Sequence, residues 1–291
     1  MSDTLIYRDT PPALLPLFGK AVLPKKVSAE ANIRLPELSA KLLYAKTSSN
    51  DLKQYERVCG FRPSSDIPIT WPHILAFPLH LKLLTEKAFP LPLLGLVHLR
   101  NSITQHRPIG KGEILELEVK LGGQERTGRG IEFSVNTIAR SAGTMVWEGD
   151  STMLFRQPDP NAQSGEKSTP PPLEHYPNTV DIKAAESIGR QYAKVSGDSN
   201  PIHMHALSAK AFGFPRAIAH GMWSKAQALA IMSQQDGWRS GPVKISCQFK
   251  KPVFLPGTAQ LNWREGKDAW DYQLLNGRGD APHLSGRIEW L

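Results

Sequence analysis

The apolar positions of the C-terminal part of the chain predict two helices followed by a series of strands. Between Ala185 and Val195, apolar residues recur at spacings of three and four, which is typical of an amphipathic helix, and Gly197 suits its left-handed end. A second helix is predicted at roughly His220 to Gln234. Its apolar residues lie on nearly every side, so other elements must enclose it. The segments VKISCQFKKPVF, TAQLNW, WDYQLL and LSGRIEWL are rich in β-branched and aromatic residues, which indicates strands.

The N-terminal part repeats this order. The segment QYERVCG at 54–60 matches QYAKVSG at 191–197, with four of seven positions identical. The first copy, like the second, is followed by an apolar, helix-like run, here Phe77 to Leu84, and then by strand-like segments. This order predicts a tandem duplication of one folding unit. The alternative, two unrelated domains with a chance match, stays open at this point.

The predicted elements define an architecture. A long enclosed helix followed by antiparallel strands predicts a sheet wrapped around a helix, which is the hot-dog architecture, and two copies predict a double hot dog of the α+β class. The segment QPDPNAQSGEKSTPPPL is polar and rich in proline, without hydrophobic periodicity, which indicates an exposed linker. We therefore expect an N-terminal unit at 1–156, a linker at 157–173 and a C-terminal unit at 174–291.

The amino-acid composition limits the kinds of partner that the protein can bind. Of the 291 residues, 40% are hydrophobic and 21% are charged, which is typical of a folded globular protein. The formal net charge of +8 suits an anionic ligand. The basic residues are scattered, however, and their densest clusters are pairs such as Lys25-Lys26, which are too short for a nucleic-acid-binding arm. We expect no nucleic-acid partner.

Neither a membrane nor an oxidising compartment is indicated. The most apolar stretch, Ile74 to Leu99, contains charged residues and three prolines, so we interpret it as protein core. The N-terminus lacks the features of a secretory signal. The two cysteines, Cys59 and Cys247, provide no disulfide framework and no Cys/His metal spacing. These features favour a cytoplasmic protein without a bound metal.

One short segment combines the residue types needed for proton transfer. In GDSNPIH, Asp198, Asn200 and His203 bring a carboxylate, an amide and an imidazole within six residues. The Asn200-Pro201 pair favours a turn over a helix, so Asp198 and His203 are expected to share one tight loop. An acid and a base that face the same space can activate a water molecule and move its protons.

A place for developing negative charge is predicted nearby. Gly221 lies at the start of the enclosed helix, where backbone N–H groups have no partner within the helix. A glycine there lets a ligand approach the backbone closely. An oriented N–H at a helix N-terminus stabilises an oxyanion, which makes Gly221 a candidate donor.

The two segments GDSNPIH and FGFPRAIAHGMWSKAQAL together resemble the MaoC-like family of (R)-specific enoyl-CoA hydratases and 3-hydroxyacyl-thioester dehydratases, also called hydratase 2. The resemblance is strong over about 40 residues and looser over the rest of the C-terminal half. It implies reversible hydration of an enoyl thioester without a cofactor. It also implies that Asp198 and His203 activate the water and handle its protons, that Gly221 provides the oxyanion donor, and that Asn200 shapes the loop or contacts the substrate.

The N-terminal half resembles the non-catalytic half of double hot-dog members. Phe61 stands at the position that matches Asp198, and the stretch that matches NPIH is absent. Our alignment places Phe77-Pro78 against His220-Gly221, and a proline has no N–H to donate. We therefore expect one active site per chain. The resemblance implies that the first half shapes the acyl pocket and favours a medium or long chain.

Other residues are weaker candidates. His220 is expected near the helix start as a supporting or substrate-contacting residue. The resemblance places Lys250 and Lys251 near the phosphates of the carrier, which is CoA or acyl-carrier protein. His205 suggests a His-x-His metal site, but no third ligand follows at a useful spacing. His98 and His106, on opposite sides or at opposite ends of a predicted strand, are interpreted as carrying no functional signal.

Two alternative functions and the oligomeric state stay open from the sequence. A hot-dog thioesterase shares the fold and would hydrolyse the thioester instead of hydrating it. A catalytically silent subunit that binds acyl thioesters is a second alternative. A monomer and a homodimer are both compatible with a duplicated unit, because the two copies can pair within one chain.

Overall fold

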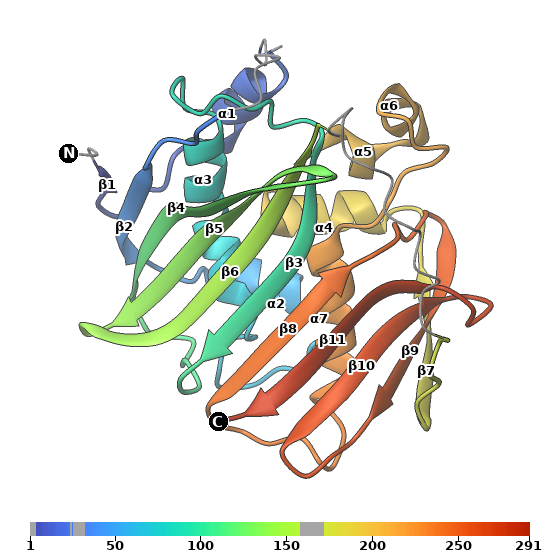
Figure 1. The fold of residues 1–291 in the computed structure, drawn as a ribbon. Coiled ribbons are helices and arrows are strands. Elements are labelled where there is room, and N and C mark those ends of the chain that lie inside the picture. Colours follow the sequence, from blue (N-terminus) through green and yellow to red (C-terminus); the bar gives the residue numbers. More distant parts are fainter. Residues whose placement is uncertain (1–3, 24, 26–32, 158–171) are drawn as a thin grey trace.

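One large sheet runs through both halves of the protein (Figure 1). The computed structural model describes residues 4–23, 25, 33–157 and 172–291. Within them, eleven strands form a sheet in the order β1-β2-β4-β5-β6-β3-β8-β11-β10-β9-β7. All neighbouring strands are antiparallel except β1 and β2 at one edge. The helices lie on one side of this sheet (Figure 1).

The N-terminal half supplies six of the strands. Its elements are β1 (Leu5–Tyr7), α1 (Leu14–Ala21), β2 (Ser39–Ala45), α2 (Ser49–Cys59), α3 (Trp71–Leu84), β3 (Leu96–Gln105), β4 (Leu115–Thr127), β5 (Gly130–Ser141) and β6 (Thr144–Arg156).

The C-terminal half repeats the same series. Its elements are β7 (Asn178–Ala184), α4 (Ile188–Ser196), α5 (Pro201–Met204), α6 (Ala206–Ala211), α7 (Gly221–Met232), β8 (Val243–Phe249), β9 (Gly257–Arg264), β10 (Ala269–Asn276) and β11 (Pro282–Trp290). From β2 and from β7 onward, each half runs strand, helix, long helix and four strands, and the two strand orders mirror each other across β3 and β8. The elements β1 and α1 precede this series in the N-terminal half and have no counterpart in the described C-terminal half. This symmetry confirms the double hot-dog architecture and the α+β class. Only α5 and α6 lack a counterpart in the described N-terminal half.

The domain boundaries stay a prediction. The strand β6 ends at Arg156, and β7 begins at Asn178. The predicted linker at 157–173 falls mostly on 158–171, which lie outside the described residues. Among the described residues, no helix is long and apolar enough to cross a membrane.

The long helix of each half is enclosed, as the apolar pattern predicts. In α7, nine of the twelve residues are buried, and they include Met222, Trp223 and Lys225. The helix begins at Gly221, as expected, and α4 ends with Gly197 at φ 78°, in the left-handed region that favours glycine.

The alignment of the N-terminal helix was wrong. Helix α3 begins at Trp71 rather than at Phe77, so Pro78 lies in its interior. By position in the helix, Thr70-Trp71 corresponds to His220-Gly221. The proline that occupies the first turn is Pro72, where a missing N–H costs no hydrogen bond. The absence of a donor at Pro78 therefore says nothing about an oxyanion site in this half.

A buried lysine joins the two halves behind the pairing of β3 with β8. Lys225 on α7 is fully buried, and its ammonium donates to Asn101 Oδ1 at 2.6 Å and to the Asn101 carbonyl at 3.3 Å. It also donates to the carbonyl of Ile245 at 3.1 Å. Burial lowers the pKa of Lys225 to about 8. Three acceptors from both halves therefore compensate a cation that has lost its water.

This network predicts strong coupling between Lys225 and Asn101. Asn101→Leu leaves the buried ammonium without its best acceptor, and a buried charge deprived of a partner costs about 3–5 kcal/mol. Lys225→Met removes the charge together with its need for acceptors, so the double variant should lose clearly less stability than the two single variants combined. Urea unfolding of the four proteins measures this coupling.

Asn262→Leu is the matched control. Asn262 is a buried asparagine of β9 whose amide donates to Tyr176, Asn178 and Thr179. The losses in free energy of unfolding caused by Asn262→Leu and Lys225→Met should therefore add in the double variant. If the losses caused by Asn101→Leu and Lys225→Met also added to within about 0.5 kcal/mol, the proposed coupling would be wrong.

Candidate active site

A cavity of about 650 Å³ lies between the two halves. Residues of α3, β3, β5 and β6 line its N-terminal side, and residues of the α4–α7 connection and β8 line its C-terminal side. The structure brings all seven candidate catalytic and substrate-binding residues to this one cavity: Asp198, Asn200, His203, His220, Gly221, Lys250 and Lys251. Their roles in binding or catalysis stay predictions.

The loop after α4 is shaped by its own polar side chains. Asp198 Oδ1 accepts from the backbone N–H of Asn200 at 3.2 Å, and Asn200 Oδ1 accepts from the N–H of Ile202 at 3.3 Å. Asn200 thus caps the N-terminus of α5, with Pro201 at the first helical position. The sequence left two roles open for Asn200, and the structure shows the one that shapes the loop.

His203 is held in one tautomer. The side chain is buried, and its Nδ1 lies 2.8 Å from the carbonyl oxygen of Ile218. Because a carbonyl only accepts, Nδ1 carries the proton, and Nε2 keeps a bare lone pair. A neutral imidazole with an unprotonated Nε2 can act as a base toward a ligand in the cavity.

Two supports of His203 were missed in the sequence. One is the Ile218 carbonyl, which comes from a segment without any motif. The other is Gly189 in α4, where a Cβ would lie 2.0 Å from the His203 carbonyl oxygen. Since a backbone atom cannot swing aside as a side chain can, any larger residue at 189 would displace the His203 backbone. A glycine inside an amphipathic helical pattern was the available signal.

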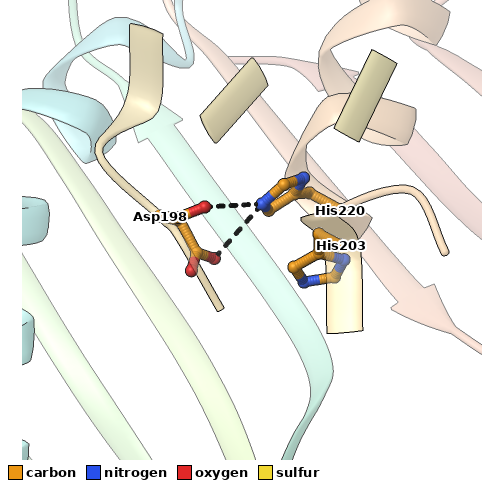
Figure 2. Close-up of side chains that lie close together, drawn as sticks. All are labelled: Asp198, His203 and His220. Carbon is orange, nitrogen blue, oxygen red and sulfur yellow. Dashed lines mark hydrogen bonds and ion pairs between the residues drawn. The ribbon is translucent and has the colours of Figure 1, made fainter. Parts of the chain in front are cut away.

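His220 contacts Asp198 directly (Figure 2). Its Nε2 donates to the backbone carbonyl of Asp198 at 2.9 Å and lies 3.8 Å from Oδ2 of the same residue. The His220 ring stacks on His203, with centroids 3.6 Å apart and planes inclined by 28°. Tyr192 lies beyond it at 4.8 Å. His220 therefore holds the Asp198 backbone and packs on the His203 ring, which favours a supporting role.

Asp198 and His203 face each other across a gap. The potential ligand atoms of Asp198, His203 and His220 lie within 4.8 Å of one another. No hydrogen bond or ion pair joins the Asp198 carboxylate to the His203 ring in the described structure. A single water molecule can bridge polar groups at such a separation.

Burial shifts both groups toward their uncharged forms. It raises the pKa of Asp198, and the nearby His203 and the N–H of Asn200 only partly offset this. Burial also lowers the pKa of His203, against the opposing effects of Asp198 and the Ile218 carbonyl. The carboxyl and the imidazole thus become more alike in proton affinity, which eases proton transfer through a shared water.

Among the described residues, the same three side chains are the one group of three or more His, Cys, Asp or Glu residues close enough together to share a metal ion. His203 uses Nδ1 for the Ile218 carbonyl, and His220 uses Nε2 for the Asp198 carbonyl. Each ring therefore has one nitrogen left, and the two rings stack instead of converging on one point. The absence of a metal stays a prediction, and His205 lies exposed outside the cluster.

Gly221 presents a free donor. Its backbone N–H is at the first position of α7, and no hydrogen bond to another described residue occupies it. A Cβ at this position would lie 3.0 Å from the ring of Phe249, so glycine also permits the close contact with β8. The N–H and the helix dipole favour negative charge at this point of the cavity wall.

Lys250 and Lys251 lie at the rim. Both side chains are exposed, and neither forms a hydrogen bond or ion pair with a described residue. Their backbone N–H groups instead donate to the carbonyl of His283, at 2.8 and 3.3 Å. The two ammonium groups are therefore available to an anionic ligand that enters the cavity.

Known proteins share this fold and this segment. The MaoC like domain family model matches residues 168–285. The 3-hydroxyacyl-thioester dehydratase X of Mycobacterium tuberculosis is 34% identical over 239 residues, which cover 81% of this chain and 84% of the relative. The crystal structure of HtdX from the same organism has a TM-score of 0.75 and 31% identity, covering 87% of this chain and all of that one.

Two more distant proteins are also similar to this chain, one in sequence and one in fold. The peroxisomal enoyl-CoA hydratase 2 of Arabidopsis thaliana is 26% identical over 191 residues, which cover 59% of this chain and 60% of the relative. A protein of M. tuberculosis described as a double hot-dog fold has a TM-score of 0.51 at 10% identity, covering 85% of this chain and 93% of that one, which shows the fold alone. The fold and the cavity define a double hot-dog protein. Because its similarity to dehydratase X extends over most of both chains, this chain belongs to the MaoC-like dehydratase family.

The shifted pKa of Asp198 predicts an unusual effect of a substitution. Its pKa is raised in the folded state, so its carboxyl favours the folded state only at low pH, and this contribution is lost as the pH rises through the folded pKa. Asp198→Asn should therefore keep or raise the thermal midpoint at neutral pH.

Glu113→Gln is the control, because it should change the thermal midpoint in the opposite direction. Hydrogen bonds from Arg107, Ser141 and Gly110 lower the pKa of Glu113 to about 2, so its stabilisation is present above the ordinary value of 4.5. Glu113→Gln should lower the thermal midpoint at neutral pH. If Asp198→Asn lowered it equally, the burial argument for Asp198 would be wrong.

Proposed function

We propose that this protein catalyses the reversible hydration of trans-2-enoyl thioesters to (3R)-3-hydroxyacyl thioesters. The observation that carries the proposal is the convergence of Asp198, His203 and the free Gly221 N–H on one cavity. The similarity to a 3-hydroxyacyl-thioester dehydratase and to an enoyl-CoA hydratase 2 supports the reaction type. The R configuration follows the family resemblance.

The geometry suggests a role for each group in hydration. Water bound between the two side chains gives a proton to Nε2 of His203 while its oxygen adds to C3 of the enoyl group. The electron pair of the double bond moves onto the thioester oxygen, where the Gly221 N–H stabilises the enolate. The protonated Asp198 carboxyl then delivers a proton to C2. The proton on His203 returns to Asp198, and the reverse sequence is dehydration.

The raised and lowered pKa values favour the starting state of this sequence. It needs one proton on the pair, held by Asp198 while His203 is neutral. Burial raises the pKa of Asp198 and lowers that of His203, so both changes stabilise this arrangement against the charged carboxylate–imidazolium pair. His220 would keep Asp198 oriented through its carbonyl.

The carrier and the setting are parts of the proposal. Lys250 and Lys251 at the rim suit the phosphates of CoA or of the acyl-carrier-protein prosthetic group. The N-terminal half supplies one wall of the cavity and no counterpart of the Asp198–His203 loop, so one site per chain is proposed, with a medium or long acyl chain. A cytoplasmic location belongs to the same proposal.

The loss of ultraviolet absorbance of a conjugated enoyl thioester tests the function. Wild-type protein should hydrate crotonyl-CoA and, faster, a medium-chain trans-2-enoyl-CoA. Asp198→Asn and His203→Gln should each lower kcat by about 10²–10⁴-fold, because each removes a proton-transfer group.

His205→Gln is the matched control, because His205 is exposed two residues from His203. Its activity should stay near wild type. Release of free CoA thiol without hydration would show a thioesterase instead. Equal activity of wild type and both site variants would contradict the proposed roles.

The pH dependence of kcat/KM offers a second test. His203 acts as a base only when neutral, and burial lowers its pKa below the ordinary 6.5. The acid limb of the profile should therefore lie below pH 6.5, with enzyme returned to neutral pH recovering full activity. An acid limb above 6.5 would show that His203 is not held neutral as proposed.

A further inference from the structure

The N-terminal wall of the cavity is one face of helix α3. Residues at spacings of three and four along this helix line the cavity: His73, Ile74, Phe77, His80, Leu81 and Leu84. If the thioester is held near Gly221 as proposed, the acyl chain must extend along this face. Four of these side chains are apolar, as expected for a hydrocarbon chain, and two are not.

Three histidines interrupt the apolar wall. His73 and His80 come from α3, and His98 comes from the start of β3. The rings of His73 and His80 meet edge to face at 5.0 Å, and His98 packs on Phe249 at 4.9 Å. His73 is 9% exposed and His80 is 6% exposed. His106, in contrast, follows β3 and pairs with Glu148 outside the cavity.

These imidazoles are incompletely partnered. His80 Nε2 lies 2.7 Å from the hydroxyl of Thr137. His98 Nε2 is buried and has no partner, and no hydrogen bond from the His73 ring to a described residue is present. A buried polar group without a partner destabilises the fold, and leucine or phenylalanine at these positions would avoid that cost. The cluster therefore provides unused hydrogen-bonding capacity inside an acyl cavity.

The charge state of the three imidazoles limits the chemical class of ligand that they can bind. Burial, with the nearby Lys225 ammonium, lowers the pKa of His73 to about 4. Burial, with His73 and Lys225, lowers the pKa of His98 to about 3. Burial, with His73 and His98, also lowers the pKa of His80. At neutral pH each ring is uncharged and has one donor and one acceptor nitrogen, of which Nε2 of His80 already contacts the Thr137 hydroxyl. This chemistry suits a hydroxyl or a carbonyl oxygen and does not neutralise a carboxylate.

We propose that the preferred substrate is an enoyl thioester whose acyl chain carries an uncharged oxygen substituent, a hydroxyl or keto group, which His73, His80 and His98 bind. This inference rests on the proposed function and specifies its substrate class. The buried Ser151 hydroxyl, which also lines the cavity and accepts from Asn101, leaves its own proton free for the same oxygen.

The test compares matched medium-chain trans-2-enoyl-CoA esters with wild-type protein. One ester is unsubstituted, one series carries a hydroxyl and a second series carries a keto group at successive carbons beyond the double bond. We expect kcat/KM for the best oxygenated ester to exceed that of the unsubstituted ester by about ten-fold or more, the effect of one or two neutral hydrogen bonds. The two series show which oxygen is bound. If the unsubstituted ester is equal to or better than every oxygenated one, the inference is overturned.

His73→Leu and His98→Leu identify the residues responsible. Each should reduce the ratio of kcat/KM for the best oxygenated ester to that for the unsubstituted ester by several-fold, because each removes hydrogen-bonding groups from the cavity wall. His175→Leu, at an exposed histidine, is the matched control and should leave the preference unchanged. An unchanged preference in both cavity variants would overturn the assignment of oxygen binding to these histidines.

Crotonyl-CoA separates this inference from the proposed function. Its chain ends one carbon beyond the double bond and carries no group for the histidines to bind. Activity on crotonyl-CoA without any preference for oxygenated esters would overturn the histidine proposal alone. No hydration of crotonyl-CoA or of any ester would overturn the proposed function itself.

Discussion

The pairing of β3 with β8 is the constraint on which the rest of the structure depends. Six residue pairs, from Arg100↔Gln248 to Gln105↔Val243, join the six strands of the N-terminal half to the five strands of the C-terminal half in one sheet. Without it, each half would expose an unpaired strand edge, which is a site for aggregation. The same pairing brings Asn101 of β3 and Ile245 of β8 to the two sides of Lys225, so the ammonium loses its water only where both halves are present.

This constraint also explains why one half can specialise. A single hot-dog unit must pair with another to cover its long helix, and here the second unit is part of the same chain. The N-terminal unit has a short connection at 60–70 where the C-terminal unit has α5 and α6. It keeps the sheet and the enclosed helix and provides the α3 face that lines the cavity. Because the N-terminal half needs only to keep the sheet and the enclosed helix, it can serve as the proposed substrate-binding half while the C-terminal half carries the proposed reacting groups.

The sequence predicted those parts whose signals are local. The duplication, the enclosed helix and the turn at Gly197 each depend on patterns within one segment, and the Asp198–His203 loop forms from hydrogen bonds between residues two apart. The start of α3 was missed because Trp71-Pro72 continues an apolar run that does not mark its own beginning. The Ile218 carbonyl was missed for a different reason. Its contact with His203 is a tertiary contact between elements, to which no local pattern corresponds.

Lys225 and the cavity residues show two different uses of burial. Lys225 has three acceptors, and its cost of desolvation is offset by contacts that join the halves. Asp198 and the histidines of α3 and β3 are less completely compensated, so burial shifts their pKa values toward the uncharged forms. In a low-dielectric cavity, an uncharged acid and an uncharged base can exchange a proton without creating a costly ion pair in the resting state. The same absence of charge would let the distal imidazoles distinguish a hydroxyl from a methylene without attracting carboxylates. Proton transfer at one end of the cavity and selectivity at the other would then share one physical origin, polar groups that the fold leaves for the substrate to satisfy.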